Sequence, residues 1–273
     1  MSENELIEQT PAHLLAAMQE DTGTGMEDMG NYIVPPRLKV IQDKKVLEGI
    51  QGCVTGQVVI MPQVSTLCMP DGSFFFTVLY MWDEFCIHNP YKIKTLQMIR
   101  ERTLDPKSEI ATKAQLLTRE PCPEAPNDDD AKLKYVTHLN FLLAVYGIPE
   151  LEGIEILYSA FLGEFKTGKN LINLLRTRTT RGVPIYGHIL EAAPGVHSPK
   201  SGGDDWYGLN ITNPTAGSDI GSFATLQNEV KDPELFGEFK AAHKRAKENK
   251  ERFQAVYEDI AVEEETQTVG DTL

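Results

Sequence analysis

Short runs of apolar residues, bounded by glycine, proline, asparagine or aspartate, recur along most of this chain. Many of their side chains are β-branched or aromatic, a composition that favours strands. An extended segment also starts near Ile33, because Pro35 and Pro36 disfavour helix in the residues before them. The pattern predicts a small barrel or a strongly bent sheet, with strands at residues 54–61, 74–82, 135–146, 154–162, 183–191 and 206–212.

A different periodicity, typical of helices, occurs in three places. Residues 232–262 contain few helix breakers and repeat apolar residues at helical spacing, which predicts a long C-terminal helix with one buried stripe. Residues 108–117 predict a short helix within an insertion of about residues 88–131. A third helix is expected from Thr167, a residue type that often caps helices. The expected fold class is therefore α+β and β-rich.

Charge is concentrated at the two ends of the sequence. The formal net charge is −14; residues 1–31 hold seven acids and residues 258–273 hold six, with no lysine or arginine in either segment. The 226 residues between them carry a net charge of only −1. This distribution predicts a flexible acidic leader (1–31), a single core domain (32–257) and an acidic tail (258–273).

Composition places the chain among soluble, folded proteins. Apolar residues make up 41% of the 273 residues, enough for a substantial core. No apolar run is long enough to span a bilayer and the N-terminus lacks a signal-peptide pattern, so we expect a cytoplasmic protein. The four cysteines form no C-x-x-C pair and are expected to be reduced thiols.

Patterns for catalysis or metal binding are weak. Cys86 and His88 have the spacing of two ligands, but Cys122 and His138 lie far away in the sequence, so no four-ligand site is predicted. No G-x-S-x-G or H-E-x-x-H signature is present. We therefore expect no metal, no cofactor and no enzymatic activity.

The strongest binding signal is a basic segment over residues 166–181. It contains five cations and no acid, and it spans the helix expected from Thr167. Helix N-termini and clustered cationic side chains both favour phosphate groups. The alternative is a solvated surface without a ligand. The expected phosphate contacts in this segment are Lys166, Lys169, Arg176, Arg178 and Arg181.

The same part of the chain resembles a phosphate-binding P-loop. Residues 163–169 match G-x-x-x-x-G-K between an apolar run and a helix, which is the context that such a loop requires. The match fails at Asn170, where a P-loop has the Ser or Thr that binds magnesium, and Phe165 places a bulky ring inside the loop. A nucleotide-dependent enzyme is therefore kept only as an alternative.

Aromatic residues supply a second binding signal. Phe74, Phe76, Tyr80 and Trp82 occupy alternate positions of residues 74–82, which places these four on one face of a strand and Phe75 on the other. Exposed rings stack on the bases of single-stranded nucleic acid, whereas buried rings fill a core, and the sequence leaves both interpretations open. The candidate stacking residues are Phe74, Phe76, Tyr80, Trp82, Trp206 and Tyr207.

Motifs in the first part of the chain resemble a group of phage-encoded proteins. Residues 21–27 match D-x-G-x-G-[FM]-E, residues 33–42 contain P-x-L-K-x-x-Q, and residues 166–175 match a Thr/Lys-rich segment before a short helix. The group resembles replication or recombination accessory proteins, in particular single-stranded DNA-binding proteins with an oligonucleotide-binding (OB) barrel. After Gln42 this chain has Asp43-Lys44-Lys45 instead of the expected serine and phenylalanine, so no DNA-contact residue is transferred.

We therefore expect a non-catalytic single-stranded DNA-binding protein of phage DNA replication or recombination, located in the host cytoplasm. Its core would be an OB-like barrel with a helical insertion and a long C-terminal helix. Arg37 and Lys39 join the basic segment as expected phosphate contacts. The acidic tail is expected to tune binding and to recruit replication or recombination proteins. A phage structural or host-interaction protein that binds no nucleic acid is the remaining alternative, and a homo-oligomer is left open.

Overall fold

The computed structural model describes residues 35–42, 53–61, 65–90, 93, 98–198, 205–214 and 229–248. The chain divides into two units, Met1–Val34 and Pro35–Leu273, and all described residues belong to the second. The predictions for the leader and for the tail therefore lie outside the described residues.

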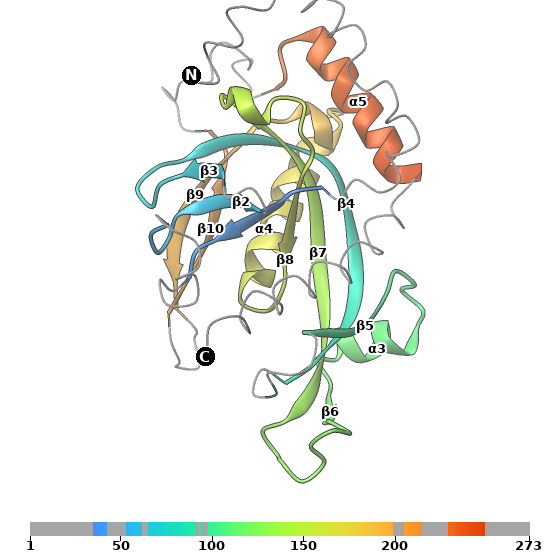
Figure 1. Ribbon diagram of the computed structural model, residues 1–273. Coiled ribbons are helices and arrows are strands. Elements are labelled where there is room, and N and C mark those ends of the chain that lie inside the picture. The colour runs from blue at the N-terminus through green and yellow to red at the C-terminus, as the bar shows by residue number, and fades with distance from the viewer. Residues whose placement is uncertain are drawn as a thin grey trace, which may run out of the picture. The chain divides into compact units, whose positions relative to one another are not determined.

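Ten strands in the described part of the chain form one sheet, which curls strongly into a half barrel (Figure 1). Their order is β10-β9-β4-β7-β8-β1-β2-β3, with β5 beside β4 and β6 beside β7. Neighbouring strands are antiparallel except β1 and β8, which are parallel. The strands are β1 (Arg37–Val40), β2 (Val58–Met61), β3 (Ser65–Cys68), β4 (Phe74–His88), β5 (Ile99–Thr103), β6 (Arg119–Pro121), β7 (Lys132–Tyr146), β8 (Ile156–Ala160), β9 (Leu190–His197) and β10 (Trp206–Thr212).

The two long strands β4 and β7 form the centre of the sheet. Each has 15 residues, and they pair along most of their length. Between them the chain forms β5, helix α3 (Glu109–Gln115) and β6, in the region of the expected insertion. The Oγ of Ser108 accepts a hydrogen bond from the N–H of Ala111 at 3.1 Å and so caps α3. The short helix predicted at residues 108–117 is confirmed.

A β-bulge in β4 changes which side chains face each side of the sheet. The pairing with β7 shifts between Val78 and Tyr80, and an extra residue reverses the alternation of faces. Phe74, Phe76 and Val78 therefore join one core, whereas Tyr80 and Trp82 pack in a cluster on the other face. The expectation that the four alternating aromatic residues of 74–82 share one face is wrong for this reason.

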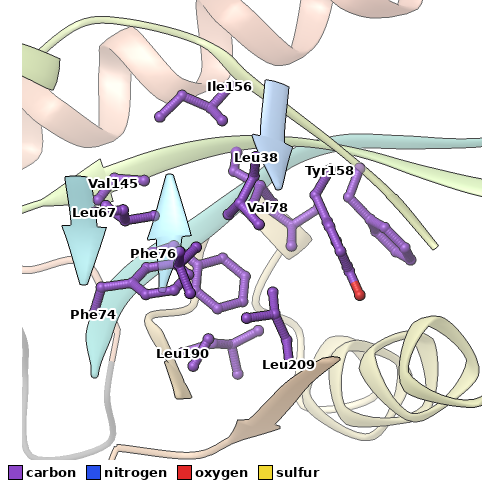
Figure 2. Packing of buried hydrophobic residues seen from close by; sticks show 14 of the residues in the cluster. Leu38, Leu67, Phe74, Phe76, Val78, Val145, Ile156, Tyr158, Leu190 and Leu209 are labelled. Carbon is purple, nitrogen blue, oxygen red and sulfur yellow. The ribbon is translucent and has the colours of Figure 1, made fainter. Parts of the chain in front are cut away.

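The main core fills the inside of the curled sheet (Figure 2). Its side chains come from β1 to β4, from β7 to β10 and from helix α4 (Phe165–Thr179). Leu171 and Leu175 of α4 are fully buried in it, and burial of such a side chain stabilises the fold by about 2 kcal/mol. Helix and sheet approach closely at Gly168, where an added Cβ would lie 2.8 Å from the Cβ of Ala160. One side of α4 is therefore held firmly against the sheet.

Helix α5 (Pro233–Glu248) packs on the opposite face of the sheet. Phe239, Ala242 and Ala246 are its buried residues, and they pack with Leu79 and Trp82 of β4. Their spacing of three and four residues matches the predicted stripe. The helix predicted for residues 232–262 is present over Pro233–Glu248, and the rest of that range lies outside the described residues.

The side-chain amide of Gln42 joins the two sides of the curl. Gln42 follows β1, and its Oε1 accepts a hydrogen bond from the N–H of Tyr207 in β10 at 2.9 Å, while its Nε2 donates to the carbonyl of Tyr207. The amide thus imitates the pairing of a further strand residue. The Tyr207 ring lies over Gly56, which has a φ of +84° and no room for a Cβ. Gln42 is the last residue of the P-x-L-K-x-x-Q motif, and its role here is to close the sheet.

The described elements confirm a mixed α+β, β-rich fold with a strongly curled sheet, and the OB-like topology stays a prediction. The strand predicted at residues 183–191 is wrong over most of its length. Pro184 begins a 3-10 turn, η4 (Ile185–Gly187), and β9 starts only at Leu190. Among the residues that the structure describes, no helix is both long and apolar enough to cross a membrane.

Candidate nucleic-acid interface and buried polar cluster

Helix α4 presents most of the basic segment on the side away from the core. Its N-cap is Glu164, not the predicted Thr167, which is buried in the first turn. The buried residues follow the helical period, so the opposite side faces solvent. Lys166, Lys169 and Arg176 lie on that exposed side. The helix therefore offers three cations that the core does not use.

Strand β10 brings an aromatic pair to the N-terminal end of α4. Trp206 stacks on His197 of β9, with ring centres 5.8 Å apart and an angle of 25° between the planes. The indole also lies against Gly163, where an added Cβ would be 3.0 Å from it. Burial lowers the pKa of His197, and the nearby charge of Lys166 lowers it further. A partly buried indole and a lysine thus lie close together at this end of the helix.

A cleft of about 740 Å³ lies at the other end of α4. Amide and hydroxyl groups form much of its wall, and Arg178 and Arg181 add two positive charges. Arg178 donates a hydrogen bond to the Oδ1 of Asn213, just beyond β10. Burial and the charge of Arg181 lower the pKa of Arg178, but a guanidinium stays charged at neutral pH. Apart from Glu229, the residues of this wall are neutral or basic, so the cleft suits an anionic group that also accepts hydrogen bonds.

Helix, strand and cleft together form one candidate binding surface, which we call the α4–β10 face. The structure brings all five predicted cations of the basic segment to it and adds one of the predicted aromatic residues. Its members are Lys166, Lys169, Arg176, Arg178, Arg181 and Trp206.

Three of the predicted stacking residues are core residues. Phe74, Phe76 and Trp82 are only 4%, 1% and 9% exposed. A ring buried to this degree has no face available for a base, so these three side chains serve packing, and base stacking is not assigned to them. The physical reason is that the sheet curls around one face of β4 while α5 covers the other.

The remaining predicted contacts lie away from the α4–β10 face. Tyr80 packs between Trp82 and His243 of α5. Arg37 and Lys39 alternate on β1 with the inward-facing Leu38, so they lie on the opposite face of the sheet from α4. Tyr207 follows Trp206 on β10 and, as described above, lies over Gly56.

The segment that resembles a P-loop has a different conformation. Residues 163–169 run through the 3-10 turn η3 (Leu162–Glu164) into α4, and Phe165 is already helical. Gly168 packs against the sheet, and the Nζ of Lys169 lies 4.6 Å from the centre of the Phe165 ring. A P-loop needs free backbone N–H groups in a loop that wraps the phosphates. Here the corresponding residues form a 3-10 turn and the first turn of α4 instead of a loop. Residues 163–169 therefore do not form the P-loop on which the nucleotide-dependent alternative was based.

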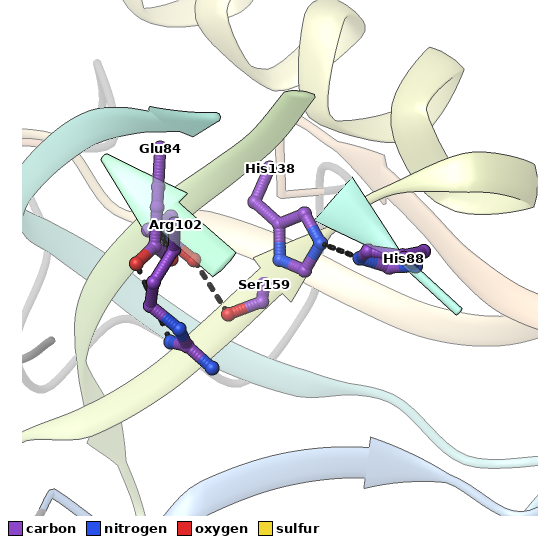
Figure 3. A network of polar contacts seen from close by, with 6 residues as sticks. Glu84, His88, Arg102, His138 and Ser159 are labelled. Atoms are coloured by element: carbon purple, nitrogen blue, oxygen red, sulfur yellow. Dashed lines mark hydrogen bonds and ion pairs between the residues drawn. The ribbon is translucent and has the colours of Figure 1, made fainter. Parts of the chain in front are cut away.

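A buried polar cluster lies where β4, β7, β8 and β5 meet (Figure 3). Glu84 is 1% exposed and accepts hydrogen bonds from Arg102 and from Asn140, both at 3.3 Å. The Oγ of Ser159 donates to the Oδ1 of Asn140 at 2.6 Å. Burial raises the pKa of Glu84, while Arg102 and Asn140 act in the opposite direction. Removing the guanidinium of Arg102 would take away the charged hydrogen-bond partner of the buried Glu84 carboxylate.

Two histidines and a cysteine extend this cluster. The Nε2 atoms of His88 and His138 lie 2.7 Å apart in a hydrogen bond, and Phe161 stacks on the His138 ring at 4.2 Å between centres. Burial lowers the pKa of His88 to about 4 and also lowers the pKa of His138, so both rings are neutral at pH 7. Burial raises the pKa of the neighbouring Cys86, which is therefore a protonated and unreactive thiol in this arrangement.

Sequence reasoning did not find this cluster. Cys86 and His88 are visible as a pair in the sequence, but only the pairing of β4 with β7 brings His138 to them across 50 residues. Cys122, the other distant cysteine, packs beside α3 and donates to a carboxylate oxygen of Glu124. The available signal was the alternation of Glu84, Cys86 and His88 at the end of a strand that is mostly apolar.

Comparison with known proteins finds no match among protein-family models, curated proteins or solved structures.

Proposed function

We propose that this chain binds single-stranded DNA, without catalysis, through the α4–β10 face. The observation that carries the proposal is the combination of exposed cations on α4 with an indole at one end and a cleft with two arginines at the other. Cations attract the phosphates of the backbone, and the partly buried indole, which stacks on His197 and lies against Gly163, offers its remaining exposed surface to a base. The face therefore matches both chemical components of a single strand.

A single strand suits this face better than a duplex does. Unpaired bases are free to stack on an aromatic side chain, which contributes about 1–3 kcal/mol per base. The cleft beside Arg178 and Arg181 has a volume of about 740 Å³ and can admit one nucleotide unit. The bases of a duplex are stacked on one another, so a duplex would offer mainly its phosphates to this face.

The resemblance to phage accessory proteins supplies the setting of this proposal, which is DNA replication or recombination in the host cytoplasm. In that setting the acidic tail, residues 258–273, competes with DNA for the cations of the α4–β10 face and recruits other replication or recombination proteins.

The test is a titration of a fluorescently labelled single-stranded oligonucleotide at low and moderate salt, with duplex DNA and ATP as competitors. We expect tight binding that weakens with salt and is displaced poorly by duplex or ATP. The double variant Lys169→Glu with Arg176→Glu should bind at least about tenfold more weakly. The slope of log Kd against log salt concentration should be smaller by about 1.4 in this variant. Each single-strand phosphate contact contributes about 0.7 to that slope, and two contacts are removed.

A matched control carries the same change of charge on another helix. Lys240 and Lys244 of α5 are exposed on the opposite side of the sheet, and Lys240→Glu with Lys244→Glu alters the net charge equally. This control should bind DNA nearly as well as the unmodified chain. Equal weakening by both pairs would show that net charge alone acts, and absence of binding at low salt would refute the proposal.

A further inference from the structure

Three ligand-type side chains meet inside the buried polar cluster. Cys86 and His88 are two residues apart on β4 and so point to the same face, and His138 reaches that face from β7. One ligand atom from each residue lies within 4.8 Å of the others, and the exposed fractions of the three residues are 0%, 0% and 2%. The three ligand atoms are therefore near enough for one ion to reach all of them after small side-chain movements, and the cluster is shielded from solvent.

The hydrogen-bonding capacity of the His88–His138 pair is only partly used. Each neutral imidazole has one N–H donor and one acceptor nitrogen, and the two Nε2 atoms use one of each in their hydrogen bond. The Nδ1 atoms of His88 and His138 are both buried and have no hydrogen-bond partner. Buried polar atoms in folded proteins nearly always have a partner, so two orphan atoms on adjacent rings mark this histidine pair as a feature that core packing alone does not explain.

We propose that Cys86, His88 and His138 bind a divalent transition-metal ion of the zinc class. One thiolate and two imidazoles are a donor set that zinc prefers, with a fourth position that water fills in sites with three protein ligands. Tetrahedral bonds of about 2.0–2.1 Å would hold the Nε2 atoms about 3.3 Å apart. The ion thus replaces the hydrogen bond of 2.7 Å by separating the two rings by about 0.6 Å.

Protons balance in this exchange. The thiol of Cys86 loses its proton to solvent as the thiolate binds the ion. The histidine that donates through Nε2 moves its proton to Nδ1, so both Nε2 lone pairs point to the ion and both rings stay neutral. Binding therefore releases one proton for each ion.

The consequence is a cross-link between the two central strands. Cys86 and His88 belong to β4 and His138 belongs to β7, so the ion would hold the strands together beyond their backbone hydrogen bonds. Glu84 pairs with Arg102 next to the site, so these two charges largely offset each other there. The proposal is independent of DNA binding, because none of these residues belongs to the α4–β10 face.

The test uses the full chain expressed without a histidine tag. After dialysis against a chelator, titration with Co²⁺ should give one ion per chain, with the absorption of tetrahedral cobalt and a thiolate-to-cobalt charge-transfer band. Zn²⁺ should displace the cobalt and raise the thermal midpoint, because the ion binds the folded state. A chain that shows no charge-transfer band and no stabilisation by Zn²⁺ would overturn the proposal.

Variants assign the ligands. Cys86→Ser should abolish the charge-transfer band and His138→Gln should weaken Co²⁺ binding at least about tenfold, whereas Cys122→Ser, a buried thiol outside the cluster, should change neither. If Cys86→Ser does not fold, the complementary variant with Ala at Cys53, Cys68 and Cys122 keeps Cys86 as its only cysteine and should retain the band. Loss of the band in that variant, or its survival in a folded Cys86→Ser chain, would place the ion elsewhere.

Discussion

Glu164 sits between η3 and α4, where its Oε2 accepts a hydrogen bond from the hydroxyl of Tyr158 at 2.7 Å. Burial raises the pKa of this carboxyl, and the hydrogen bond from Tyr158 only partly offsets the effect. The folded chain therefore binds the Glu164 proton more tightly than the unfolded chain does. Above the ordinary pKa of a glutamate, holding this side chain ionised in the fold costs stability, and the cost grows as the pH rises to the folded pKa.

Glu164→Gln should therefore stabilise the fold at pH 8 and have little effect at pH 4. The amide oxygen can still accept from Tyr158, while the buried negative charge is gone. Urea denaturation at both pH values measures the difference in free energy of unfolding. Glu150→Gln is the control, because Glu150 is exposed and should show no such difference. A gain of equal size at pH 4 would contradict the assignment to a buried carboxylate.

Helices α4 and α5 both contain a glycine, and the two glycines differ in their surroundings. Gly168 of α4 lies against the sheet, where an added Cβ would be 2.8 Å from Ala160 and 2.9 Å from Leu139. Gly237 of α5 has nothing within 4 Å of an added Cβ. The first glycine thus sets the distance between helix and sheet, whereas the second only weakens its helix.

The substitution to alanine should consequently have opposite signs in the two helices. Gly168→Ala should destabilise the chain by about 1–3 kcal/mol, because the methyl group overfills a close-packed contact. Gly237→Ala should stabilise it by about 0.5–1 kcal/mol through lower conformational freedom of the unfolded chain. Chemical denaturation of both variants provides the comparison, and a stable Gly168→Ala chain would show that α4 can move away from the sheet.

Over the whole molecule, the acidic ends and the α4–β10 face carry opposite charges. The tail, residues 258–273, holds six of the chain's 40 acids and no base, while the α4–β10 face has five cations. Because the tail and the face belong to one chain, the tail is present near the face at a high effective concentration. A free DNA ligand must compete with it for the same cations. Salt screens this attraction between charges that lie farther apart than a Debye length, which is about 10 Å at 0.1 M.

Deletion of residues 258–273 should therefore tighten binding of single-stranded DNA, by about tenfold at low salt and by less as the salt concentration rises. Replacing the six acids by their amides keeps the chain length unchanged and should reproduce the effect. This variant separates the contribution of the tail's charge to DNA affinity from the contribution of its length. Fluorescence titration of the same oligonucleotide gives the dissociation constants. Unchanged or weaker binding after deletion would exclude the tail as a competitor.

Sequence alone was sufficient for features that depend on neighbouring residues. Strand composition, the short helix at residues 108–117 and the helical repeat of α5 each arise within a few residues, so local propensity predicts them. The basic character of residues 166–181 is likewise local, because the helix that forms there turns its apolar residues inward and its lysines outward. The mixed, β-rich class followed from these local patterns.

Tertiary structure decided everything that depends on contacts between distant residues. A bulge against β7 moved Tyr80 and Trp82 to the other face, and the curl of the sheet buried Phe76. The register of β4 with β7 also placed His138 beside His88, which no spacing in the sequence records. The physical reason is that strand register and burial result from pairing and packing between residues that are far apart in the sequence. A pattern of neighbouring residues reports only local preferences and does not specify these long-range contacts.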